Sequence, residues 1–163
     1  MKGFTLIEIL VALLILSFII GAIFAILNVA NLSWNSSMGS LDLQQEVRQA
    51  MDGMIREIRQ SKPTAITVDP SGAKVDFSIP NISNAISYSL SANKIIRVYP
   101  AGSGTFWTLA NNISSLNFCC LGGANCTDCA NSQILQIQMQ AAKTVRNQSL
   151  SFPLQEKVKF RNE

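Results

Sequence analysis

Four cysteines lie close together in the second half of the chain, at positions 119, 120, 126 and 129. Three kinds of chemistry use cysteines in such a cluster. Two disulfides could close a small loop, four thiolates could bind zinc or iron, or Cys126 and Cys129 could form a redox pair with the spacing of a thioredoxin-like motif. The choice among these readings depends on the spacing and on the compartment in which the loop lies.

The spacing favours disulfides. Zinc ribbons use two well-separated cysteine pairs, whereas the adjacent Cys119 and Cys120 would chelate one tetrahedral ion awkwardly. A redox pair at Cys126 and Cys129 would need a strand followed by a helix, which this part of the sequence does not predict. Neighbouring residues of a strand point to opposite faces, so Cys119 and Cys120 are not expected to pair with each other. The connectivity stays open, and no metal site is expected.

The remaining composition gives little support for catalysis. The chain has no histidine, which removes the commonest general base and metal ligand. It shows no pair of carboxylates, no Ser/His/Asp set and no phosphate-binding glycine loop. The net charge is +3 without any run of Lys or Arg, so nucleic-acid binding is not indicated. We expect a protein that is not an enzyme, with no cofactor and no small-molecule substrate.

One carboxylate stands at the start of a long apolar run. Residues 9–27 are apolar apart from Ser17 and Gly21, and Glu8 comes directly before them. A helix of roughly 20 apolar residues spans a bilayer. A charge at the centre of such a helix costs at least about 2.5 kcal/mol and less near an interface, so Glu8 either marks the membrane boundary or has a function.

The residues around Glu8 resemble a known signal. Residues 2–8 read Lys-Gly-Phe-Thr-Leu-Ile-Glu, and with the apolar residues that follow they closely resemble the prepilin signal of type IV pilins and type II secretion pseudopilins. The resemblance implies that a prepilin peptidase cuts after Gly3 and methylates the new amine of Phe4. It also implies that Glu8 pairs with the terminal amine of a neighbouring subunit, which fits the high cost of a lone carboxylate in an apolar medium.

The signal and the charges predict a topology. Residues 1–3 are expected to be a leader and residues 4–30 a transmembrane helix that later lies in a filament core. Lys2 precedes the apolar run and no basic cluster follows it, which places the N-terminus inside and residues 31–163 outside the inner (cytoplasmic) membrane. An exported domain lies in an oxidising compartment, which again favours disulfides.

The patterning predicts an α+β fold, and the resemblance implies that this fold is pilin-like. We expect one helix over about residues 4–61, weakest between residues 28 and 40, with its second half amphipathic and its end set by Pro63. Apolar residues at three- and four-residue steps predict its buried stripe: Leu43, Val47, Met51, Met54, Ile55 and Ile58.

After Pro63 the periodicity changes to that of strands packed as an antiparallel sheet against the helix. Strands or short apolar segments are expected at residues 66–68, 75–79, 86–90, 95–99, 106–109, 113–118 and 134–139. The end of the chain is expected to form two short strands, or a strand and a tail. The strand order is left open.

These observations favour a structural subunit, a minor pilin or pseudopilin. Its expected partners are prepilin peptidase, other pilin or pseudopilin subunits, the inner membrane and the assembly platform. The alternative is a single-span anchored domain outside the membrane, whose cysteine loop (Cys119, Cys120, Cys126 and Cys129) binds a metal or exchanges disulfides.

Overall fold

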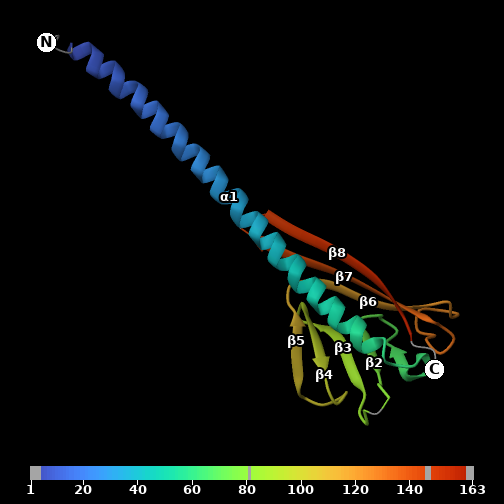
Figure 1. Ribbon diagram of the computed structural model, residues 1–163. Coiled ribbons are helices and arrows are strands. Elements are labelled where there is room, and N and C mark those ends of the chain that lie inside the picture. Colours follow the sequence, from blue (N-terminus) through green and yellow to red (C-terminus); the bar gives the residue numbers. More distant parts are fainter. Residues whose placement is uncertain (1–4, 81, 146–147, 161–163) are drawn as a thin grey trace. The chain divides into compact units, whose positions relative to one another are not determined.

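The structure is a computed structural model that describes residues 5–80, 82–145 and 148–160. It contains one helix, α1 (Leu6–Ile58), a short 3₁₀ turn, η1 (Pro63–Ala65), and antiparallel strands in two sheets (Figure 1). The expected α+β class, a long N-terminal helix with antiparallel strands, is confirmed. The chain divides into two compact units, one ending at Gly39 and the other beginning at Ser40.

The first unit consists of the first part of α1. All its side chains from residue 5 to residue 34 are exposed, although most of them are apolar. Two of its polar side chains bond to the helix backbone: the Ser17 hydroxyl donates to the Leu14 carbonyl at 2.7 Å, and the Asn35 amide donates to the Asn31 carbonyl at 2.7 Å. Such local bonds satisfy a polar side chain without water, which suits a helix in lipid.

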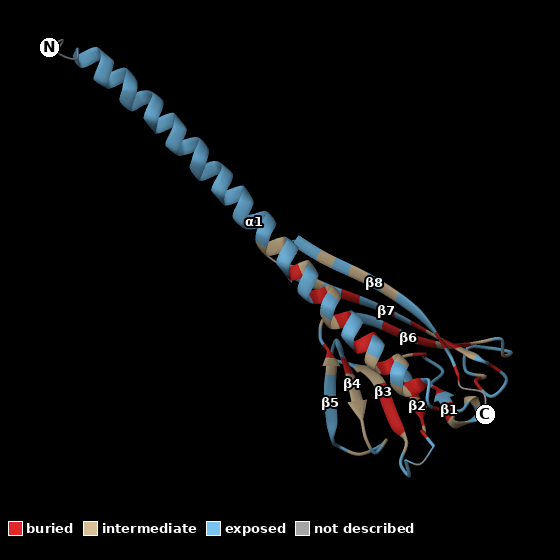
Figure 2. Cartoon of the chain, viewed as in Figure 1, coloured by how far each residue is buried: buried red, intermediate tan, exposed pale blue. Residues whose placement is uncertain are grey.

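In the second unit, the remainder of α1 packs against both sheets. The buried residues of this segment are Leu43, Val47, Ala50, Met51, Met54 and Ile58 (Figure 2). Five of them belong to the predicted apolar stripe; the sixth member of that stripe, Ile55, is half-buried. The three- and four-residue spacing thus identified the face of α1 that joins the core.

The helix ends slightly earlier than predicted. Pro63 disfavours helical geometry at the residue before it, and Lys62 is extended, with φ −91° and ψ 149°. The regular helix therefore stops at Ile58, and a tighter turn follows in which the Ser61 N–H donates to the Ile58 carbonyl at 3.0 Å. The buried Ser61 hydroxyl donates to the same carbonyl at 2.7 Å and is thereby satisfied.

The first sheet is a meander in which each strand pairs with the next. Its strands are β1 (Ile66–Val68), β2 (Lys74–Phe77), β3 (Ile86–Ser91), β4 (Lys94–Val98) and β5 (Phe106–Ala110). All pairs are antiparallel. The short apolar segment expected at residues 106–109 is a true strand, and it forms one edge of this sheet.

Two turns of the first sheet use positive φ values. In the β3–β4 hairpin, Ala92 and Asn93 have φ 47° and 60°, the signs that a tight hairpin turn requires. Between β1 and β2, Gly72 has φ 73°, and a Cβ there would collide with the Asn117 side chain. The Phe118 N–H donates to the Gly72 carbonyl at 2.8 Å, so this turn joins the first sheet to the second.

The second sheet has the order β6 (Ile113–Leu121), β7 (Ile134–Val145) and β8 (Gln148–Lys159). The prediction of two short strands, or a strand and a tail, at the end of the chain is wrong, because β8 is one continuous strand of 12 residues paired along β7. Pro153 lies within this strand, opposite Gln140. An edge strand tolerates proline, since one side of its backbone needs no partner.

Both sheets contribute to one core with α1. Large side chains that are almost fully buried include Val75, Phe77, Ile86, Tyr88 and Ile95 in the first sheet, and Ile113, Phe118, Leu135, Ile137 and Val158 in the second. Figure 2 shows the buried positions of α1 facing these strands. The second part of α1 is therefore packed against both sheets. The cysteine loop lies at one end of the second sheet, between β6 and β7.

Candidate assembly segment and cysteine loop

The first part of α1 has the length and composition of a membrane span. Its most apolar window has a mean hydropathy of 3.1, and none of that window is buried within the protein. An apolar surface of this extent is normally covered by lipid or by other protein, since soluble monomers rarely expose such large patches. The segment from Leu6 onward is thus a candidate both for membrane insertion and for contact with other subunits.

Glu8 lies in the first turn of α1 and bonds to the residue before the helix. One of its carboxylate oxygens, Oε2, accepts from the Thr5 N–H at 2.8 Å and from the Thr5 hydroxyl at 2.9 Å. This is the glutamate half of a capping box, which satisfies a backbone donor that the helix itself leaves free. A negative charge in this turn also interacts favourably with the helix dipole.

The capping role of Glu8 was missed at the sequence level, although its signal was present. Thr5 and Glu8 have the Thr-x-x-Glu spacing that precedes an apolar helical run. The other two expected site residues, Gly3 and Phe4, lie outside the described residues. Cleavage and methylation there therefore stay expectations.

The structure joins the cysteines in two disulfides, Cys119 to Cys126 and Cys120 to Cys129. Cys119 and Cys120 point to opposite faces of β6, as neighbours in a strand do, and each pairs with a different cysteine of the loop. Cys120 and Cys129 are buried in the core, whereas Cys126 is exposed. One disulfide thus belongs to the core, and the other ties the outer face of the loop to β6.

Hydrogen bonds within the loop support both disulfides. The Cys120 N–H donates to the Cys126 carbonyl at 2.9 Å. Asp128 accepts from the Ala124 N–H at 3.2 Å and from the Asn131 amide at 3.1 Å. The Asn131 side chain and then the Ala124 N–H hold the pKa of Asp128 below its ordinary value, because both stabilise the ionised form.

A buried serine closes the base of the loop. The Ser132 hydroxyl lies within hydrogen-bond distance of the Leu121 carbonyl, where β6 ends, and 2.8 Å from the Ile134 carbonyl, where β7 begins. The loop is consequently a fixed tip of the second sheet. Within residues 5–80, 82–145 and 148–160, no group of three or more His, Cys, Asp or Glu side chains is arranged to hold a metal ion.

A second polar centre connects α1 to the first sheet. Glu57 Oε2 accepts from the Tyr88 hydroxyl at 2.7 Å and from Arg97 Nε at 3.0 Å. Tyr88 lies opposite Arg97 in the β3–β4 pair, so both donors face the helix side by side. Burial, and then the bond to Glu57, raises the pKa of Tyr88 far above its ordinary value of 10.0, so this hydroxyl stays a donor.

A third polar contact of α1 is made by Glu46, which precedes Glu57 in the helix. Glu46 Oε1 accepts from the Asn111 backbone N–H at 2.7 Å and from its side-chain amide at 2.8 Å. On another flank, the Arg48 guanidinium lies over the Phe152 ring of β8 at 5.8 Å. These contacts hold α1 in place on both sheets. The sequence placed Glu46 and Arg48 on the polar face of the helix but could not identify their partners.

The comparison with known families bears on the N-terminal segment. Residues 1–24 match the family described as the prokaryotic N-terminal methylation motif. The match covers residues 1–3, Glu8 and most of the apolar span, and does not extend to the sheets. No curated protein matches the chain.

Proposed function

We propose that this chain, which carries a prepilin-type N-terminal methylation motif, is the precursor of a structural subunit of a type IV pilus or a type II secretion pseudopilus. The observation that carries the proposal is the coincidence of two features in one segment. The methylation motif at residues 1–24 overlaps the first part of α1, whose apolar side chains are exposed along their whole length. Such a helix fits both a bilayer and a bundle of like helices.

The proposed mechanism uses the same surface twice. Residues 4–30 first anchor the chain in the inner membrane with residues 31–163 outside. Prepilin peptidase then removes residues 1–3 and methylates the amine of Phe4. Finally the helix leaves the lipid and packs among the helices of other subunits at the assembly platform. Because lipid tails are as apolar as the side chains of a helical bundle, little hydrophobic free energy opposes this transfer.

Glu8 has two successive partners in this mechanism. Before assembly its carboxylate is bonded to Thr5, as in the structure. In the filament it meets the terminal amine of Phe4 from a neighbouring subunit, so that two opposite charges enter the apolar core together. Only one of its oxygens bonds to Thr5, which leaves the other oxygen for this second partner.

The subunit is further proposed to be a minor one, which primes or caps a filament. This part of the proposal rests on a general likeness to minor subunits in the end of α1, at residues 54–60, and in the closing residues 158–162. The disulfide-closed loop (Cys119, Cys120, Cys126 and Cys129) and the strands would then face solvent or partner subunits. The role is structural and not catalytic.

Variants of Gly3 and Glu8 test the proposal in the producing cell. Gly3→Val should give a chain that inserts in the membrane but stays unprocessed, because a bulky residue blocks the cut. Glu8→Gln should be processed normally and yet be depleted in sheared filaments, because it lacks the charge that meets the amine. Glu8→Gln still accepts from the Thr5 N–H, so helix capping is largely kept and serves as the internal control.

Normal migration and assembly of Gly3→Val would contradict the proposed function. Normal incorporation of Glu8→Gln would remove the pairing mechanism alone. A subunit that acts first at a filament tip has no subunit ahead of it to supply the second charge, so the assignment as a filament subunit would stand in that case.

A further inference from the structure

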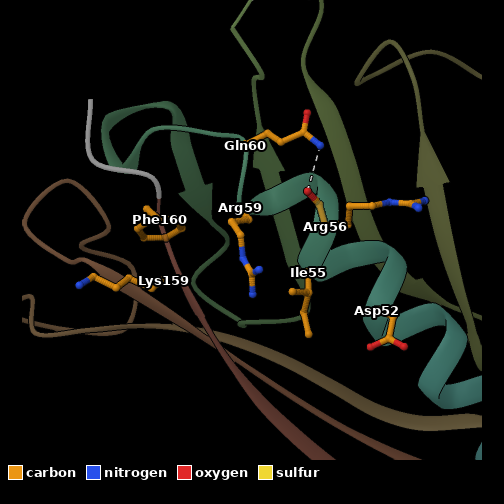
Figure 3. Close-up of a pocket in the computed structure, with 7 residues that line it drawn as sticks. All are labelled: Asp52, Ile55, Arg56, Arg59, Gln60, Lys159 and Phe160. Carbon is orange, nitrogen blue, oxygen red and sulfur yellow. Dashed lines mark hydrogen bonds between the residues drawn. The ribbon is translucent and has the colours of Figure 1, made fainter.

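A groove of about 870 Å³ lies on the second unit, between the end of α1 and the end of β8 (Figure 3). Its lining includes Asp52, Ile55, Arg56, Arg59, Lys159 and Phe160. The apolar side chains of the lining are Ile55, which is half-buried and offers part of its surface, and Phe160, which is almost fully buried. The rim is formed by charged side chains of α1 and β8.

The rim is strongly cationic. Arg56, Arg59 and Lys159 are all exposed, against one carboxylate, Asp52. In Figure 3 the Arg59 side chain lies between Ile55 and Phe160, whereas Arg56 extends away from them. Among the residues that the structure describes, the ion pairs are Lys74 with Asp76 and Arg97 with Glu57, so none of the three cations of the groove has a carboxylate partner there.

We propose that this groove binds an acidic segment of a different subunit, with one apolar side chain on Ile55 and carboxylates on Arg59 and Lys159. The inference rests on the proposed function for the nature of the partner, and on charge complementarity for its chemistry. Arginine at the edge of an apolar depression is a common anchor in protein interfaces, since its guanidinium donates two parallel hydrogen bonds to one carboxylate.

A second copy of this chain fits the groove poorly. Its net charge is +3, and most of its described carboxylates already have partners. Those with partners are Glu8, Glu46, Glu57, Asp69, Asp76 and Asp128. Asp42, Asp52 and Glu156 stand apart from one another in sequence and are not flanked by a second acid. A partner with two clustered carboxylates beside an apolar residue is the better complement.

Peptide binding to the full-length chain in neutral detergent tests the proposal. The probe is a fluorescein-labelled peptide, Ser-Gly-Glu-Leu-Glu-Glu-Gly-Ser, followed by anisotropy, and its control has Gln in place of each Glu. The acidic peptide should bind, and its affinity should fall as salt rises from about 50 mM to about 500 mM, because solvent-exposed charges are screened. The Gln peptide should not bind measurably.

Variants locate the binding. Arg59→Gln with Lys159→Gln should weaken the acidic peptide about tenfold, because two rim charges are lost. Ile55→Ala should weaken it about twofold to threefold through the smaller apolar contact. The matched control is Lys94→Gln with Lys143→Gln, which changes the net charge equally at positions outside the groove and should leave binding unchanged. Thermal melts show that each variant is folded.

Three results would overturn the inference. The acidic peptide could fail to bind, the control variant could lose as much affinity as the groove variant, or millimolar inorganic phosphate could displace the peptide completely, which would indicate a simple anion site. Binding of a free peptide requires neither processing nor assembly. Its failure would therefore leave the proposed function intact, and failure of the proposed function would show separately in the Gly3 and Glu8 variants.

Discussion

At the scale of single residues, carboxylates of α1 accept hydrogen bonds from the strands and the loop that pack against the helix. Glu57 is the clearest case, since one oxygen accepts from both Tyr88 and Arg97. Glu46 does the same for Asn111. A helix that supplies acceptors to a sheet can be rotated or shifted only at the cost of several hydrogen bonds. These carboxylates therefore fix the position of α1 on the sheets, whereas apolar contacts alone would allow small rotations or translations of the helix.

We predict that Glu57→Ala destabilises the protein by about 2 kcal/mol, because the Tyr88 hydroxyl, in a side chain that is 1% exposed, is left without an acceptor. The matched background is Tyr88→Phe, which removes the donor. In the Tyr88→Phe background, Glu57→Ala should lower the free energy of unfolding by clearly less, since only the partly exposed Arg97 loses its partner. The measurement is the unfolding midpoint of the four chains in one buffer. Equal costs in both backgrounds would contradict the account of this contact.

The cysteine loop gives a prediction about pH. The pKa of Asp128 lies below its ordinary value of 3.8 in the folded chain, because the Asn131 side chain and then the Ala124 N–H bind its ionised form. The ionised Asp128 carboxylate therefore stabilises the folded chain fully above the unfolded pKa of about 3.9. This stabilisation is lost as the pH falls through the pKa of Asp128 in the folded chain.

Asp128→Asn tests this directly, because it cannot titrate. The difference in unfolding midpoint between the parent and Asp128→Asn should be constant from pH 7 to about pH 5 and should shrink as the pH is lowered further. Both chains keep the disulfides Cys119–Cys126 and Cys120–Cys129, so the loop stays closed throughout. A difference that stays constant down to about pH 2 would show that the carboxylate contributes nothing through its charge.

At the scale of elements, local sequence signals predicted most of the fold. The apolar stripe of α1 and the alternation in β6 and β7 each identify a buried face. The error at β8 has a physical origin. Residues 148–159 form one strand because they pair along β7, and local patterning does not contain that pairing.

The β3–β4 hairpin contains a residue that is unfavourable for its conformation. Ala92 has φ 47° and Asn93 has φ 60°, and a non-glycine residue other than Asn or Asp pays roughly 1 kcal/mol in this region. Ala92→Asn should therefore stabilise the protein by up to about 1 kcal/mol, because Asn is favoured in such turns. Ala73→Asn, at an ordinary φ, is the control. A lower unfolding midpoint for Ala92→Asn would contradict the turn geometry.

At the scale of the whole molecule, the two units differ in how much of their function and of their contacts can be predicted from the sequence. The functional reading of the first unit rests on a short continuous motif, residues 1–24, and is therefore visible in the sequence. The contacts of the second unit join residues far apart in the chain, such as Glu57 with Arg97 or Gly72 with Phe118. The cationic groove depends on such pairings, and the disulfide connectivity depends on the conformation of the loop, so neither could be predicted.

The central claim is that the chain is a prepilin-like precursor, and the intact mass of the mature protein purified from membranes tests it most directly. The account predicts the loss of residues 1–3, a gain of about 14 Da for one methyl group, and four fewer hydrogens for the disulfides Cys119–Cys126 and Cys120–Cys129. A chain that keeps residues 1–3 and carries no methyl group, in cells with an active prepilin peptidase, would contradict it.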